Sequence, residues 1–100
     1  MSVRLLSPAP CLGGHFIFKL RTDALTHANI PVGSRLLACP STDAQNGDLV
    51  IARTPRGKVV RFYQRCGSAV CLSARSPDYI PVMLPHKTVE ILGVVCTILA

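Results

Sequence analysis

Short apolar runs alternate with turn-forming residues along the whole chain. The runs are rich in valine, isoleucine, leucine and phenylalanine, and glycine, proline or asparagine separates most of them. Turns spaced about 8 to 12 residues apart are typical of an antiparallel barrel or sandwich, and no apolar stripe of helical period is long. We therefore predict an all-β fold, with strands over residues 15–20, 35–39, 48–53, 58–64, 69–72, 79–83 and 88–99.

Turn residues frame one hairpin in the middle of the chain. Asn46-Gly47 precedes the run 48–53, and Thr54-Pro55-Arg56-Gly57 separates that run from 58–64. Glycine accepts the positive φ that tight entry turns often require. These signals predict that the two runs pair as antiparallel strands.

The N-terminal part of the chain has a different pattern. Two prolines and two glycines interrupt residues 1–14, which predicts an irregular N-terminal arm. We expect residues 15–100 to form a single small β domain, with one short helical turn within 22–29.

The charge balance suggests an interaction surface. The chain has 11 basic and 5 acidic residues, a formal net charge of +6, and only 16% charged residues in total. The basic residues are densest over 53–65, which predicts either a solvated face or a patch that binds nucleic acid or an acidic partner. The residues of this candidate patch are Arg53, Arg56, Lys58 and Arg65.

Cysteine spacing gives little support for a metal site or a cofactor. The odd number of cysteines, five, argues against a closed disulfide framework and favours buried thiols. Cys66 and Cys71 are close in sequence, but no second ligand pair accompanies them, so we expect no metal and no cofactor. Residues 91–100 are apolar but too short to span a bilayer, and no membrane partner is expected.

Seven segments, taken in order, resemble a known family. They cover most of the chain from residue 15 to 99, and each is a weak signal alone. Together they resemble the C-terminal domain of the LexA/UmuD-like Ser–Lys self-cleaving proteins, the S24 peptidases. The segments are Phe16-Ile17-Phe18-Lys19-Leu20, Thr22-Asp23-Ala24-Leu25, Val32-Gly33-Ser34-Arg35-Leu36-Leu37, Asn46-Gly47-Asp48-Leu49-Val50-Ile51-Ala52, Val59-Val60-Arg61, Ser76-Pro77-Asp78-Tyr79-Ile80-Pro81 and Gly93-Val94-Val95.

The resemblance implies a strongly bent β-barrel and a chemistry that this chain has lost. In the family a neutral lysine deprotonates a serine, which attacks a peptide bond. The matched positions hold Ala24, which has no hydroxyl, and Arg61, whose guanidinium stays protonated at neutral pH. Asp23 is retained and is expected to cap its own turn. We expect no catalytic residue at these positions.

A relocated dyad is the alternative that would preserve peptidase activity. Thr22 and Thr26 flank Ala24 and carry hydroxyls, and Lys58 lies on the strand of Arg61. Residues three apart on a strand point to opposite faces, so Lys58 is expected to point away from the face of Arg61.

The resemblance also implies partners. The chain is most similar to the processed form of UmuD, because Ser7-Pro8-Ala9 lies near its start with no Cys-Gly or Ala-Gly before it. The resemblance therefore predicts an inactive homodimer in the bacterial cytoplasm, encoded by a plasmid or phage. This homodimer would support a Y-family (UmuC-like) translesion polymerase in the SOS response. A RecA–DNA filament or a UmuD/LexA-like heterodimer partner is implied as well.

Two other functions remain open. The domain would otherwise be a repressor-type dimerisation domain or a basic barrel that binds nucleic acid. The low aromatic content, 5%, argues against a base-stacking surface.

Overall fold

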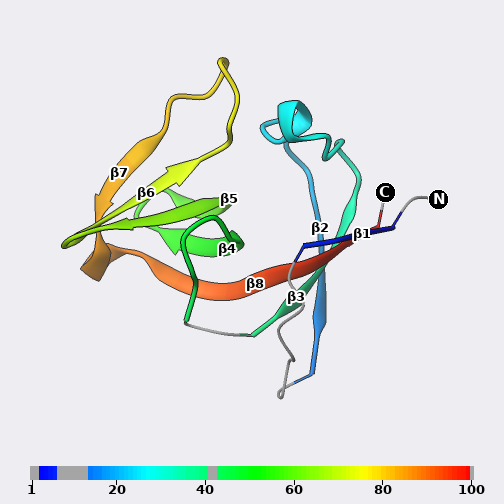
Figure 1. Cartoon of the computed structure of the whole chain (residues 1–100), viewed down its shortest axis with the longest axis horizontal. Helices are drawn as coiled ribbons and strands as arrows, with labels where there is room; N and C mark the ends of the chain where they lie inside the picture. The colour runs from blue at the N-terminus through cyan, green and yellow to red at the C-terminus, as the bar shows by residue number, and fades with distance from the viewer. Residues whose placement is uncertain (1–2, 7–13, 41–42, 100) are drawn as a thin grey trace.

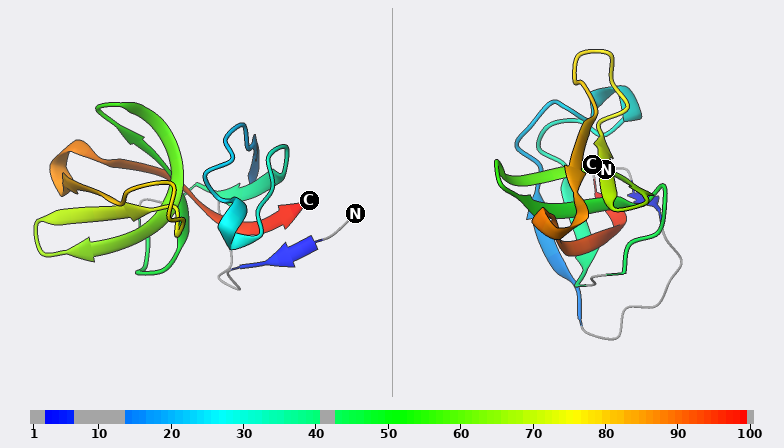
Figure 2. Two further views of the ribbon diagram at one scale, coloured as in Figure 1. Left: turned by 90° about the horizontal axis from the view of Figure 1, so that it is seen from above. Right: turned by 90° about the vertical axis from the view of Figure 1, so that its left-hand side faces the viewer.

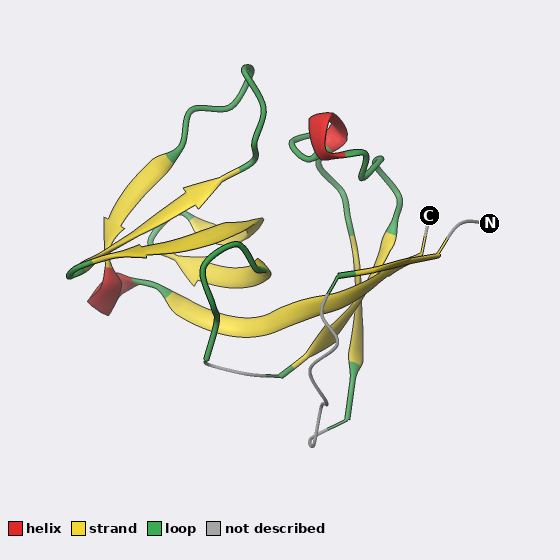
Figure 3. Ribbon diagram, in the orientation of Figure 1, coloured by secondary structure: helices red, strands yellow, loops and turns green. Residues whose placement is uncertain are grey.

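A computed structural model of the chain describes residues 3–6, 14–40 and 43–99, and nearly all regular structure within them is β. The predicted all-β fold is confirmed. Two single 3₁₀ turns, η1 (Thr26–Ala28) and η2 (His86–Thr88), accompany the strands (Figure 3). The strands are β1 (Val3–Leu5), β2 (Phe16–Lys19), β3 (Arg35–Cys39), β4 (Leu49–Thr54), β5 (Gly57–Cys66), β6 (Ala69–Ser73), β7 (Val82–Pro85) and β8 (Glu90–Leu99).

The strands form one curled antiparallel sheet in the order β2-β3-β8-β4-β5-β6-β7, with β1 added to β8. The long strand β8 crosses the molecule and joins two lobes, one holding β1–β3 and the other β4–β7 (Figures 1 and 2). Register shifts lie between Leu37 and Ala38 on β3 and between Ile51 and Ala52 on β4, both where these strands pair with β8. Because such bulges bend a strand, they explain the strong bend that the family resemblance implied.

A glycine allows close packing along β8. A Cβ on Gly93 would lie 2.8 Å from the Cζ atom of Phe16 and 3.1 Å from the carbonyl oxygen of Cys39. The ring of Phe16 therefore rests against bare backbone, and the first lobe packs closely on the central strand.

The core lies on both faces of β4. Leu49 and Ile51 face a cluster shared with β3, β8 and the β2–β3 loop, whereas Val50 and Ala52 face a second cluster with Tyr63, Val70 and Leu72. A strand buried on both faces reads as a continuous apolar run, as residues 49–52 do.

Most predicted strands are confirmed, and the central hairpin is confirmed in register. Thr54 is opposite Gly57, whose φ of 108° is the left-handed conformation that favours glycine. The strand predicted over 79–83 begins later, at Val82. Residues Ser76 and Tyr79 form an isolated bridge instead, and Pro81 has no N–H to extend a ladder.

The expectation of a wholly irregular arm is wrong for Val3–Leu5. These residues pair antiparallel with β8, Val3 opposite Leu99 and Leu5 opposite Thr97. The prolines that break the arm begin only at Pro8, so nothing prevents the first residues from completing the edge of β8. Residues 1–2 and 7–13 of the predicted arm lie outside the described residues.

The cysteines do not form the predicted set of buried thiols. Cys96 is buried, Cys71 is half-buried and Cys66 is exposed, all three as free thiols, whereas Cys39 is disulfide-bonded. Within the described ranges no group of three or more His, Cys, Asp or Glu side chains is placed to hold a metal ion. The same ranges contain no helix of the length and apolarity needed to cross a membrane.

Candidate functional site

Ala24, the position matched to the family serine, lies in a turn between β2 and η1. The hydroxyl of Thr22 accepts a hydrogen bond from the Ala24 N–H at 3.2 Å, and the hydroxyl of Thr26 donates to the Asp23 carbonyl at 2.7 Å. These bonds hold residue 24 inward, where it is 0% exposed and packs with Leu25 and Ile30 in the core. The position therefore has neither solvent access nor a hydroxyl.

Arg61, the position matched to the family lysine, lies half-buried on β5. Its Nη1 donates to the Val60 carbonyl at 2.8 Å, and its guanidinium carbon stands 5.6 Å from the centre of the Tyr79 ring. Burial lowers the pKa of Arg61, and its interaction with Tyr79 opposes that shift. The guanidinium still carries its charge at neutral pH, so it can bind an anion but cannot act as a base.

Tyr79 connects the two matched positions. Its hydroxyl donates a short hydrogen bond to Oδ1 of Asp23, the neighbour of Ala24, while its ring faces Arg61. Asp23 thus contacts a loop 56 residues away instead of serving only its own turn. The hydrogen bond to Asp23 is the main reason that the pKa of Tyr79 is raised. Tyr79 lies in one of the segments that resemble the family, but no sequence pattern indicated that it would contact Asp23 and Arg61.

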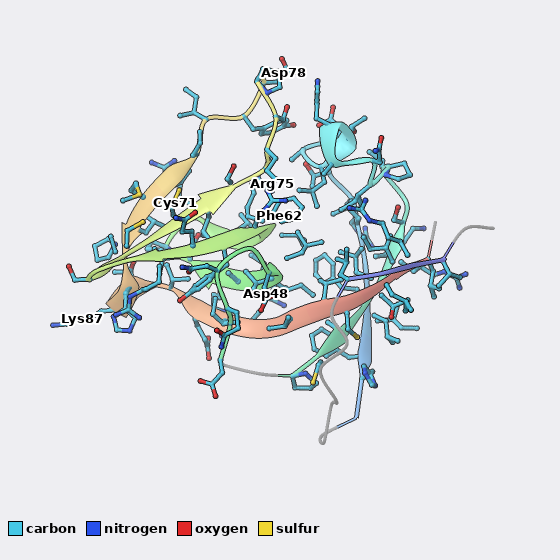
Figure 4. The ribbon with its side chains drawn as sticks, in the orientation of Figure 1. Asp48, Phe62, Cys71, Arg75, Asp78 and Lys87 are labelled. Atoms are coloured by element: carbon cyan, nitrogen blue, oxygen red, sulfur yellow. The ribbon has the colours of Figure 1, made fainter. Side chains whose placement is uncertain are left out.

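A second contact joins the same two loops. The hydroxyl of Ser76 lies 3.2 Å from Nδ1 of His27 in η1. The loops that carry these residues, after β2 and after β6, face each other at one end of the molecule (Figure 1). Nearby, Arg75 stacks on Phe62 with 3.9 Å between the guanidinium carbon and the ring centre (Figure 4). The two lobes are therefore tied at this end by side chains as well as by β8.

A groove of about 400 Å³ runs beside this network. It is lined by Phe18, Leu20, Arg21, Thr22, Lys58, Val59, Val60 and Arg61. Lys58 and Arg61 both border the groove together with Val59 and Val60, so the groove follows this stretch of β5. No hydrogen bond joins Lys58 to a threonine hydroxyl within the described part of the chain, and Ala24 does not line the groove.

The predicted basic patch is divided by the structure. Arg53 and Lys58 are opposite each other on the β4–β5 hairpin, and Arg56 lies in its turn. Arg53 forms an ion pair with Glu90 at 3.0 Å, which partly neutralises it. Arg65 lies near the other end of β5, where its Nε donates to the Gly67 carbonyl at 2.6 Å. Seven residues of extended strand, about 23 Å, separate it from Lys58.

The network gives a direct prediction about tyrosine ionisation. In a Tyr63→Phe variant Tyr79 is the remaining tyrosine, and its phenol should titrate with a midpoint above the ordinary value of about 10. Adding Asp23→Ala removes the accepting carboxylate, so the midpoint should fall. The bond stabilises the folded protein fully below about pH 10, the ordinary pKa of tyrosine. This contribution to the free energy of unfolding is lost as the pH rises through the higher folded-state pKa. Absorbance of the phenolate measures the midpoint.

Asp78 offers a matched control for this titration. It is exposed, adjacent to Tyr79 in sequence, and its side chain makes no hydrogen bond to that phenol. Asp78→Ala should lower the midpoint less than Asp23→Ala does. Equal shifts from the two variants would contradict the Asp23–Tyr79 bond.

The fold and the site together define a class of protein. A bent antiparallel sheet carries, in the turn after β2 and on β5, the segments that resemble those of the Ser–Lys peptidases. Comparison with known sequences agrees: residues 5–96 match the family described as Peptidase S24-like, and the chain belongs to this family.

Individual relatives are named LexA repressor. The chain is 30% identical over 83 residues to the LexA repressor of Geobacter sp. (strain M21), covering 81% of this chain and 41% of the relative. It is also 30% identical over 80 residues to those of Shewanella woodyi and Bordetella avium, covering 78% and 80% of this chain and 39% and 36% of the relatives. The chain thus spans about two fifths of the length of these relatives.

Proposed function

We propose that this chain is a non-cleaving member of the S24 family that dimerises and acts by binding other proteins. One observation carries the proposal: the two positions that match the dyad by motif order hold residues that cannot perform the reaction, and both side chains are fixed in place. Ala24 is sealed in the core, and Arg61 contacts Tyr79. Losing either member of a nucleophile–base pair removes most of the rate, on the order of 10⁴- to 10⁶-fold.

Exposed apolar side chains support an interface on the first lobe. Leu5 on β1 is 78% exposed, and Val3 and Ile17 are also exposed. Strands β1 and β2 are strands with an open edge in the sheet order. Symmetric homodimers are the commonest assembly of such domains, and apolar residues concentrate at the centre of their interfaces. The proposed assembly is therefore a homodimer, and the family resemblance favours the bacterial cytoplasm as its location.

Two classes of partner fit a non-cleaving dimer. The resemblance to processed UmuD favours an accessory role for a Y-family (UmuC-like) translesion polymerase in the SOS response, with a RecA–DNA filament as a further partner. The LexA repressor relatives favour a repressor-type dimerisation domain, which would pair with a LexA-like chain.

One experiment separates the two. Size-exclusion chromatography with light scattering should give twice the chain mass of 10.7 kDa. Tagged protein, recovered from cells with damaged DNA, should then bring down a Y-family polymerase or a LexA-like repressor. Leu5→Glu should weaken the dimer, and Val32→Glu, an exposed site on a loop, is the matched control. A monomer at all concentrations, with neither partner recovered, would overturn the proposal.

A further inference from the structure

The groove between the end of β2 and strand β5 combines positive charge with apolar surface. Arg21, Lys58 and Arg61 line it, and none of the described residues that border it is acidic. The other lining residues are Phe18, Leu20, Thr22, Val59 and Val60, so four of these eight side chains are apolar. A groove of this kind suits a ligand that is both acidic and apolar.

Arg61 is a half-buried cation without a carboxylate partner in the described part of the chain, where the ion pair found joins Arg53 to Glu90. Withdrawing a charge from water is unfavourable unless an opposite charge accompanies it. One N–H of the guanidinium goes to the Val60 carbonyl, and a guanidinium has five. The remaining donors form the planar fork that fits a carboxylate.

We propose that this groove binds, without cutting, an extended acidic segment of a partner protein, with a carboxylate held by Arg61. Arg21 and Lys58 add attraction along the groove, and apolar side chains of the segment pack on Phe18 and Val59. The inference rests on the proposed function, because a segment can be retained only where it is not cleaved. Replacing a proton-accepting lysine with arginine turns the former reaction site into an anion-binding site.

The surface of the groove favours a peptide over a nucleic acid. Its volume of about 400 Å³ accommodates a few side chains, within the range of pockets that hold small ligands. Phe18 is the one aromatic residue among its lining residues, whereas single-stranded nucleic acid binds on several aromatic platforms. Alternating acidic and apolar side chains match the lining better than a phosphate backbone does.

The test measures binding of a fluorescent eight-residue peptide of alternating glutamate and valine to the whole protein, at about 0.15 M salt. Arg61→Gln should weaken binding about tenfold or more, which is the loss expected for a charge-assisted carboxylate contact. Arg65→Gln removes the same charge from the same strand but outside the groove, and should change binding less than about twofold. A peptide of glutamine and valine should bind at least about tenfold more weakly.

Each other outcome has a defined meaning. Absence of binding at about 1 mM peptide, or equal losses from Arg61→Gln and Arg65→Gln, would overturn the proposal. So would tighter, Arg61-dependent binding of an oligothymidylate of equal length. If Arg61→Gln does not fold, Lys58→Gln at an exposed position must weaken binding instead. Mass spectrometry of the peptide after incubation tests the proposed function separately, because cut peptide would refute that function and intact peptide would not.

Discussion

Purified protein should leave a LexA-type repressor uncut under conditions in which an active family member cleaves it. The substrate is a full-length repressor whose own serine has been replaced, so any cut comes from the added protein. The expected rate is lower than that of the active member by on the order of 10⁴- to 10⁶-fold, because Ala24 supplies no nucleophile and Arg61 no base. Gel electrophoresis and mass spectrometry detect the products.

Restoring the dyad should not restore the reaction. In Ala24→Ser/Arg61→Lys the new hydroxyl would lie at a position that is 0% exposed and does not line the groove. A buried hydroxyl without a partner also costs about 1–3 kcal/mol of stability. Cleavage by this double variant would show that substrate still reaches residue 24. Cleavage by the unmodified protein that disappears with Thr26→Ala or Lys58→Ala would support a relocated dyad.

Local sequence signals predicted the parts of the fold that local physics determines. The pair Asn46-Gly47 and the turn ending at Gly57 fixed the ends of β4, and the register of its hairpin followed. The two-sided burial of β4 was encoded in its continuous apolar run. In contrast, strand β1 is three residues long and forms only because β8 offers it an edge. Its pairing partners lie 92 to 96 residues away, which leaves no local pattern.

The candidate site also has some features that the sequence predicts and others that it does not. Ala24 and Arg61 could be matched to the dyad from the order of the motifs, and the expected loss of chemistry rests on their side chains alone. The role of Tyr79 could not, since it depends on two loops from different lobes meeting in space. The high density of basic residues over 53–65 could be recognised from the sequence alone. Its division along β5 follows from strand geometry, and the structure places Lys58, but not Arg65, on the groove.

Strand β4 is buried on both faces, so truncating its side chains should lower the free energy of unfolding more than truncating exposed side chains does. Ile51 is 1% exposed and packs in the larger core cluster, so Ile51→Ala should lower the free energy of unfolding by about 2–5 kcal/mol. Ile17, 59% exposed on the edge strand β2, is the matched control in dilute, monomeric protein, where Ile17→Ala should change the free energy of unfolding by no more than about 0.5 kcal/mol. Urea unfolding at one protein concentration measures both, because dimerisation makes the transition concentration-dependent.

The dependence of these two stability losses on protein concentration also tests whether Ile17 lies in the dimer interface. If Ile17 lies in the dimer contact, Ile17→Ala should lower stability in dilute and concentrated protein by different amounts, whereas the effect of Ile51→Ala should be the same at both. A domain of this size has about 5–15 kcal/mol of stability, so Ile51→Ala can leave too little folded protein to measure. Ile51→Val, expected to cost about 0.5–1.5 kcal/mol, then serves instead. Equal losses at the two isoleucines in dilute protein would contradict a core centred on β4.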